Sequence, residues 1–139
     1  MFKHYRHKAE NMESSAKKVI MISGANRGIG RAIAERLLAD GYLLSLGVRN
    51  LGKLPKTLKP QVETQMLCHI YDARDRESAK RWVNLTAEKF GGIDVLVNNA
   101  GILHTNGLED DAEDLLDDMW EVNAKAPLRL TRLAFPYLK

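Results

Sequence analysis

The 139-residue chain is 45% hydrophobic and 28% charged, which allows one modest core and argues for a single domain. Its formal net charge of +3 is mild, and basic residues alternate with acidic ones, which argues against a nucleic-acid-binding stripe. No apolar run reaches the length of a membrane span, and the N-terminus lacks the apolar middle of a signal peptide. The single cysteine, Cys68, suits a reducing compartment. We therefore expect a cytoplasmic protein without nucleic-acid or membrane partners.

Residues 1–17 are polar and basic, with too few apolar side chains to fold alone, so we expect a solvated, flexible tail. The basic residues at positions 3–8 leave a second hypothesis open, which is binding to RNA. That hypothesis would be removed if their deletion left RNA binding unchanged. We place the folded domain at residues 18–139.

The stretch from residue 19 to residue 30 organises the predicted fold. Its apolar, β-branched start predicts a buried strand that ends at Ser23. Glycines follow at positions 24, 28 and 30, and apolar residues then recur at helical spacing until Gly41, which is expected to end the helix. A strand, a glycine turn and a helix in this order direct backbone N–H groups and the positive end of the helix dipole toward a phosphate. The glycines would allow a tight reversal, close approach of a pyrophosphate and close packing of helix on strand.

A second buried strand is predicted at residues 42–48, and Arg49 follows it at the place where dinucleotide-binding folds read the ribose. An acidic residue there accepts a hydrogen bond from the 2′-hydroxyl of NAD, whereas an arginine pairs with the 2′-phosphate of NADP. This sequence supplies one guanidinium at Arg49 and a second at Arg27, inside the glycine turn. Either arginine alone could be an ordinary surface residue, but the pair favours NADP(H) over NAD(H).

The middle of the chain continues the alternation of strands and helices. Residues 51–60 contain two prolines and several lysines, so a short broken helix and a loop are expected. A third strand is predicted at 62–71, a helix at 75–90 that stops at two glycines, and a fourth strand at 93–97. Asp72 follows the third strand, where it could cap the next helix or contact a ligand.

The last segment is predicted to be a loop over 102–108 and then one long helix. The acidic run that begins at Glu109 suits a helix start, where carboxylates complement the dipole, so metal binding is not expected. His104, alone in the loop, is given no role. Pro127 stands four residues beyond Asn123 and lacks the N–H that would bond to its carbonyl. We therefore expect a kinked helix whose free carbonyl holds a water, or simply a helix that bends around the core.

Four motifs occur in a recognisable order: Ser23-Gly24-x-x-x-Gly28-Ile29-Gly30, then Asp72, then Asn98-Asn99-Ala100-Gly101, then Asn123. Together they resemble the motifs of the short-chain dehydrogenase/reductase family, which usually has threonine at the place of Ser23. The resemblance runs from residue 18 to the end of the chain and covers the first half of the family's pattern. It implies a Rossmann-type α/β fold, in which a doubly wound parallel sheet has strand order 3-2-1-4 and helices on both faces. It also implies a homo-oligomer formed through the helix at 112–138.

The resemblance assigns roles to individual residues as well. It implies that Asn98 steadies the strands and that Asn99 contacts the cofactor. Asp72 and Ala73 would contact adenine, and Asn123 would be a catalytic residue that holds the water of a proton relay through its backbone. The cofactor-binding residues predicted in this way are Ser23, Gly24, Asn26, Arg27, Gly28, Ile29, Gly30, Arg49, Asp72, Ala73, Asn99, Ala100 and Gly101.

The reaction implied by the resemblance is hydride transfer between NADP(H) and a small carbonyl or alcohol substrate. In the family, a Tyr-x-x-x-Lys pair supplies the acid and base, because the lysine stabilises the phenolate of a tyrosine whose ordinary pKa is about 10. A serine orients the carbonyl. This sequence has none of the three, since Tyr137 and Lys139 are two residues apart and do not share a helix face. We expect either a longer natural chain that carries them, or a catalytically inactive nucleotide-binding or regulatory fragment. The apolar edge expected on the fourth strand favours the longer chain.

Overall fold

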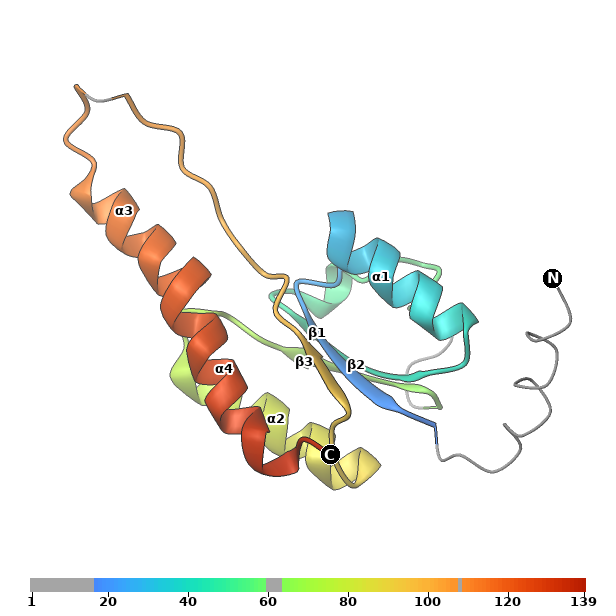
Figure 1. Cartoon of the computed structure of the whole chain (residues 1–139). Coiled ribbons are helices and arrows are strands. Elements are labelled where there is room, and N and C mark those ends of the chain that lie inside the picture. The colour runs from blue at the N-terminus through green and yellow to red at the C-terminus, as the bar shows by residue number, and fades with distance from the viewer. Residues whose placement is uncertain (1–16, 60–63, 108) are drawn as a thin grey trace, which may run out of the picture.

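The computed structural model of the protein describes residues 17–59, 64–107 and 109–139. Within these ranges, four parallel strands form one sheet in the order β3-β2-β1-β4, as the sequence predicted, with helices on both faces (Figure 1). The strands are β1 (Val19–Ser23), β2 (Leu43–Val48), β3 (Met66–Ile70) and β4 (Val95–Val97). The α-helices are α1 (Gly28–Ala39), α2 (Arg76–Phe90), α3 (Glu113–Trp120) and α4 (Ala126–Ala134). The fold is thus the expected Rossmann-type α/β sheet. Except for Lys17, the tail expected at residues 1–17 lies outside the described residues.

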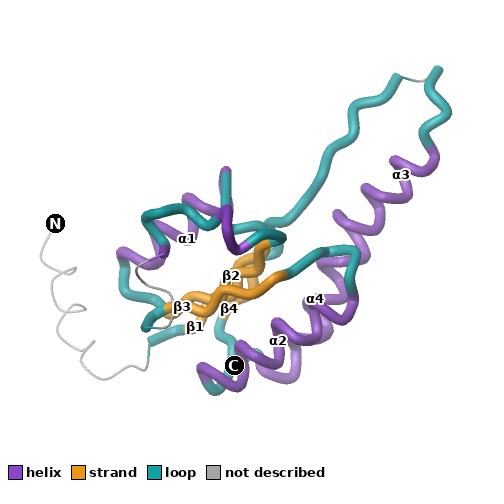
Figure 2. The backbone as a smooth tube through the Cα atoms, turned by 180° about the vertical axis from the view of Figure 1, so that it is seen from behind, coloured by secondary structure: helices purple, strands orange, loops and turns teal. Residues whose placement is uncertain are grey.

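Alternate residues of β1 point into two separate cores, one on each face of the sheet. Ile20 and Ile22 pack with Leu44 and other apolar residues under α1, on one face. Met21 packs on the other face with apolar residues of α2 and α4, which lie side by side there (Figure 2). Burial on both faces explains why β1 reads as a continuous apolar run, which is typical of strands in a parallel sheet.

A buried polar cluster anchors α2 to β2. The indole Nε1 of Trp82 donates to Ser45 Oγ at 2.8 Å, and the Ser45 and Thr86 hydroxyls are hydrogen-bonded at 2.6 Å. Thr86 Oγ1 in turn donates to the Trp82 carbonyl at 2.8 Å. Every polar group of the cluster therefore has a partner, and the Trp82 ring is held flat against β2 at Gly47.

Several predicted boundaries shift in the structure, among them the following three. β3 begins at Met66 and not at residue 62, although residues 62 and 63 lie outside the described part of the chain. β4 begins at Val95, because the expected first residue, Ile93, forms an isolated parallel bridge with Leu138 instead. The final helix begins at Glu113, one residue after the expected start at 112, so the acidic residues at 109–111 lie before the helix and not in its first turn. The reason is local, since Asp110 Oδ2 accepts from the Gly107 N–H at 2.8 Å and holds a turn that competes with the helix.

The distortion expected near Pro127 takes the form of a π-helical segment, η3 (Glu121–Lys125), which joins α3 to α4. In it the N–H of Ala126 bonds to the carbonyl of Glu121, five residues back. This replaces the expected kink: the helix widens by one residue where the proline cannot donate, and it continues without a break. It then ends in a short 3-10 turn, η4 (Phe135–Tyr137), whereas the sequence predicted helix to residue 138.

α3 and the extended loop before it project from the body of the molecule (Figure 1). A second short 3-10 helix, η1 (Leu51–Lys53), follows β2 and corresponds to the predicted broken helix. Over the described residues, no helix combines the length and the apolar character that a bilayer crossing requires.

Candidate functional site

A cavity of about 420 Å³ opens at the edge of the sheet where the strands end. Each strand supplies part of its wall: Gly24 follows β1, Gly47 lies near the end of β2, Tyr71 follows β3 and Asn99 follows β4. The crevice outside the carboxyl ends of the strands is where ligands bind in open α/β sheets. The lining residues are Gly24, Asn26, Arg27, Gly28, Ile29, Gly47, Arg49, Tyr71, Asp72, Ala73, Arg74, Asn99, Ala100, Gly101, Ile102 and Val122.

The glycine turn leaves the start of α1 open toward this cavity. Gly24 and Gly28 have φ angles of +72° and +55°, a backbone conformation that other residues rarely adopt. A Cβ atom added at Gly28 would meet nothing within 4 Å, so the backbone there faces open space. Arg27 occupies the N-cap position of α1 but its side chain makes no capping bond, and the first turn carries no acidic residue. The first N–H groups of α1 are thus left for an anionic ligand.

Gly30 has a different role, because its missing side chain leaves the space that the Asn99 side chain occupies. A Cβ atom at Gly30 would clash with the Asn99 amide and would lie 2.5 Å from the Gly24 carbonyl oxygen. The Asn99 side chain fills this space and donates from Nδ2 to the carbonyls of Ser23, at 2.9 Å, and Gly24, at 3.2 Å. Asn99 therefore fixes the glycine turn from the end of β4.

Ser23 completes the link between β1 and β4. Its side chain is buried, and its hydroxyl accepts from the backbone N–H groups of Asn99 and Ala100, both at 3.0 Å. By contrast, Asn98 donates to Thr131 on α4 at 3.1 Å. The strand-steadying role expected for Asn98 is thus performed by Asn99, since successive residues of an extended chain point to opposite sides. A contact of Asn99 with the cofactor stays a prediction.

Two exposed arginines, Arg49 and Arg27, line the cavity, and Arg49 directly follows β2. Asp72, which follows the neighbouring strand β3, holds its own turn by accepting from the Arg74 N–H at 2.9 Å. The cap of α2 is Asp75, whose Oδ1 accepts from the Glu77 N–H at 2.9 Å. Asp72 therefore serves as a turn acceptor and not as the helix cap.

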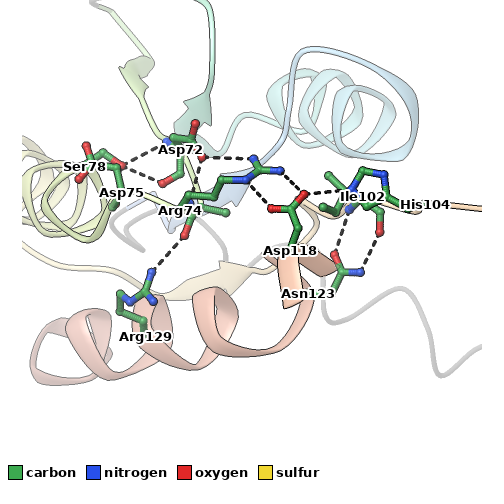
Figure 3. A network of polar contacts seen from close by, with 10 residues as sticks. Asp72, Arg74, Asp75, Ser78, Ile102, His104, Asp118, Asn123 and Arg129 are labelled. Atoms are coloured by element: carbon green, nitrogen blue, oxygen red, sulfur yellow. Dashed lines mark hydrogen bonds and ion pairs between the residues drawn. The ribbon is translucent and has the colours of Figure 1, made fainter. Parts of the chain in front are cut away.

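Arg74 connects this turn to α3 through a paired contact with Asp118 (Figure 3). His104, which the sequence left without a role, reaches the same carboxylate at 3.0 Å. The Arg74 and His104 hydrogen bonds together hold the pKa of Asp118 far below its ordinary value. The carboxylate is therefore ionised throughout the neutral range.

Asn123 lies on η3, beside the cavity but outside its lining. Its side-chain amide forms two hydrogen bonds with the backbone of Ile102: Oδ1 accepts from the Ile102 N–H at 2.9 Å, and Nδ2 donates to the Ile102 carbonyl at 2.8 Å (Figure 3). These two bonds hold the chain that follows Gly101 against the helix. The side chain of Asn123 is therefore already occupied, and the predicted role of its backbone carbonyl in holding a water stays a prediction.

Most of the predicted cofactor residues meet in the cavity. Ser23 and Gly30 do not line it, because both are buried beneath it and support the glycine turn. Sequence reasoning missed Arg74, although it belongs to the same turn as Asp72, and Tyr71, which ends the strand before that turn. The other lining residues missed are Gly47, Ile102 and Val122.

Two side chains that could act as a nucleophile or base, Cys68 and Tyr71, are held in their protonated form. Burial raises the pKa of Cys68 to about 11 and also raises the pKa of Tyr71, so both stay protonated at neutral pH. Tyr137 lies by Ile93, at the opposite end of β4 from the cavity, where its carbonyl accepts from the Ile93 N–H at 2.9 Å. Within the described ranges, no group of three His, Cys, Asp or Glu residues could hold a metal ion. The cavity is thus equipped to bind an anionic ligand through its backbone and its arginines.

Comparison with known proteins places this architecture in a family. The family model described as short chain dehydrogenase matches residues 18–139, and the chain belongs to this family of oxidoreductases. Agropine synthesis reductase from Rhizobium rhizogenes is 44% identical over 128 residues, which make up 91% of this chain and 30% of that protein.

Solved structures of short-chain dehydrogenases and related enzymes have the same fold as this chain. A short-chain dehydrogenase from Streptomyces avermitilis matches with a TM-score of 0.82 and 31% identity, over 89% of this chain and 45% of its own. An alcohol dehydrogenase from the archaeon Thermococcus sibiricus, solved in complex with 5-hydroxy-NADP, matches with a TM-score of 0.79 and 35% identity, over 87% of this chain and 53% of its own. The chain thus spans about half or less of the length of these relatives.

Proposed function

We propose that this chain forms the cofactor-binding part of an NADP(H)-dependent oxidoreductase that acts on a small carbonyl or alcohol compound. The observation that carries the proposal is the cavity itself, whose lining combines a glycine turn, an uncapped helix start and two arginines, Arg27 in that turn and Arg49 after β2. The open space in front of Gly28 fits a pyrophosphate, since a side chain there would fill it. When bound, the nicotinamide cofactor supplies or accepts the hydride, and the residues of this chain hold and orient it.

The preference for NADP(H) rests on Arg49 and Arg27. Both arginines line the cavity, and the residue that directly follows β2 is Arg49 and not a carboxylate, which would repel a 2′-phosphate. Arginine suits this task because its planar fork forms paired hydrogen bonds to phosphate oxygens. A hydroxyl in place of the phosphate would gain little from either arginine.

Replacing Arg49 with alanine tests the proposal. The loss of one charge-assisted contact corresponds to about 1.5–3 kcal/mol, so the Kd for NADPH should rise by about 10- to 100-fold. The Kd for NADH should change by less than about twofold, because NADH lacks the 2′-phosphate. Both constants can be measured by titrating the fluorescence of the reduced nicotinamide.

Lys53→Ala is the matched control, since Lys53 is an exposed cation on η1 that does not line the cavity. It should leave both affinities unchanged. If Arg49→Ala weakened NADPH and NADH equally, the assignment of Arg49 to the 2′-phosphate would be refuted. If the unmodified chain bound neither nucleotide, the whole proposal would fall.

The proposed catalytic contribution of Asn123 is made by its backbone. Its side-chain amide is occupied by Ile102, and Pro127 removes the N–H that would normally bond to the Asn123 carbonyl. A water held at this carbonyl could pass protons to and from a reacting group near the nicotinamide. Asn123 would thus serve the reaction without presenting its side chain to the substrate.

We also propose that two copies of the chain pair through the α3–α4 helix. Leu116 and Trp120 are each 61% exposed and Leu128 is 53% exposed, which is unusual for large apolar side chains. Acidic residues crowd the start of this helix, whereas its second half carries the exposed cations Lys125 and Arg132. An antiparallel pair would therefore bury apolar side chains and set each acidic end beside a basic one.

A further inference from the structure

Asp118 does not line the cavity, but it binds Arg74, which does. Arg74 Nε donates to Asp118 Oδ1 at 2.6 Å and Arg74 Nη2 donates to Oδ2 at 2.8 Å, so the guanidinium is gripped by both oxygens. The Asp118 side chain is only 25% exposed. Paired contacts of this kind fix the orientation of an arginine as well as its position.

The same carboxylate is held from a second side. His104, in the loop that leaves the cavity after Gly101, reaches Asp118 Oδ2 through Nε2 at 3.0 Å. The backbone N–H of His104 also donates to Met119 Sδ at 3.4 Å. Asp118 is therefore tied between the loop after β4 and the turn after β3, and neither segment belongs to its own helix (Figure 3).

The same guanidinium of Arg74 also lies beside Asp72. Arg74 Nη1 lies 3.7 Å from Asp72 Oδ1, which is longer than a hydrogen bond but close enough for attraction. Arg129 of α4 supports the residue between them by donating to the Ala73 carbonyl at 3.0 Å. The turn at 72–74 is thus held at two points, by Asp118 of α3 through Arg74 and by Arg129 of α4 through the Ala73 carbonyl.

One guanidinium lies between two carboxylates, because Arg74 makes the paired contact with Asp118 and at the same time an ion pair with Asp72. Arg74 lines the cavity beside Asp72 and Ala73, and Asp118 fixes its guanidinium there. Without Asp118, only the longer contact with Asp72 remains, and the guanidinium is free to swing into the cavity. A bound nucleotide would then have to displace it, which costs affinity.

We propose that Asp118 is a positioning residue for the adenosine half of the dinucleotide, because it fixes the Arg74 guanidinium in the cavity wall beside Asp72 and Ala73. The inference rests on the proposed function, since it requires that the cavity takes a nucleotide. It goes beyond that function by assigning a role in binding to a residue that does not touch the ligand.

The test measures the binding of 2′,5′-ADP, which carries only the adenosine half, by calorimetry. Asp118→Asn keeps the shape of the side chain and removes its charge, and we expect binding to weaken by about three- to tenfold. Asp117→Asn, an exposed position on the same helix, is the matched control and should bind as the unmodified chain does. In an Arg74→Ala background, Asp118→Asn should have no further effect, because the guanidinium that it holds is gone.

The outcomes separate the inference from the proposed function. The inference is overturned if Asp118→Asn binds 2′,5′-ADP as well as the unmodified chain. It is also overturned if the loss is just as large in the Arg74→Ala background, which would mean that Asp118 acts by another route. If the unmodified chain does not bind 2′,5′-ADP, the proposed function itself fails. Should Asp118→Asn not fold, Arg74→Lys keeps the cation and removes the paired contact by which Asp118 holds it, and unchanged binding by that variant would equally overturn the inference.

Discussion

Replacing Ser23 with alanine should destabilise the protein at the point where the glycine turn meets β4. The Ser23 hydroxyl accepts from two backbone N–H groups at 3.0 Å each and lies 3.4 Å from the Val97 carbonyl, to which it donates. A hydroxyl has one donor and two acceptor sites, so all of its capacity is used. Ser23 is only 2% exposed, so these contacts are made inside the protein.

The size of the destabilisation follows from the two backbone N–H groups, of Asn99 and Ala100, that lose their acceptor. A buried N–H without a partner costs about 1–3 kcal/mol. Because Asn99 and Ala100 line the cavity, water can reach their amides in part, and we expect a total loss of about 2–4 kcal/mol from the free energy of unfolding. With a urea m-value of about 1–3 kcal/mol per molar, the unfolding midpoint should fall by about 1–2 M.

Urea unfolding followed by tryptophan fluorescence measures this loss, since Trp82 is fully buried and reports on the core. Ser23→Thr is the control, because it keeps the hydroxyl. The reasoning is refuted if Ser23→Ala unfolds within about 0.5 kcal/mol of the unmodified chain, or if Ser23→Thr is as costly as Ser23→Ala. The alanine variant should also bind NADPH more weakly, since Ser23 and Asn99 jointly hold the glycine turn.

Two further predictions concern packing. In Gly47→Ala the new Cβ atom would lie 2.6 Å from two ring carbons of Trp82, so the same urea assay should show the free energy of unfolding lowered by about 1–3 kcal/mol. In the control Gly107→Ala the Cβ atom would meet nothing closer than 3.6 Å, so this variant should be destabilised far less. Equal destabilisation of the two variants would contradict the argument. Trp120→Glu should convert a dimer into a monomer in sedimentation experiments, whereas Leu51→Glu, on the exposed 3-10 helix η1, should not. An unmodified chain that sediments as a monomer would end the pairing proposal.

The sequence predicted the order of the elements and the position of the ligand-binding edge because both depend on short-range patterns. The apolar run of β1, the glycines after it and the helical spacing beyond them lie within two dozen residues, so local propensity suffices to identify them. The strand order came from the family resemblance, and the structure confirms it. Boundaries were less accurate, because turns such as the one held by Asp110 depend on a single side chain.

What the sequence did not reveal are the contacts that join these elements across long distances. Arg74 and Asp118 are 44 residues apart, and nothing in either local pattern indicates the other. The division of work between Asn98 and Asn99 likewise depends on which side of β4 each one faces, and only the packing of β4 against β1 and α4 decides that. Local patterns determined which segments carry the chemistry of this protein. The tertiary structure decided which side chains hold those segments together, because such contacts exist only once the sheet and helices have packed.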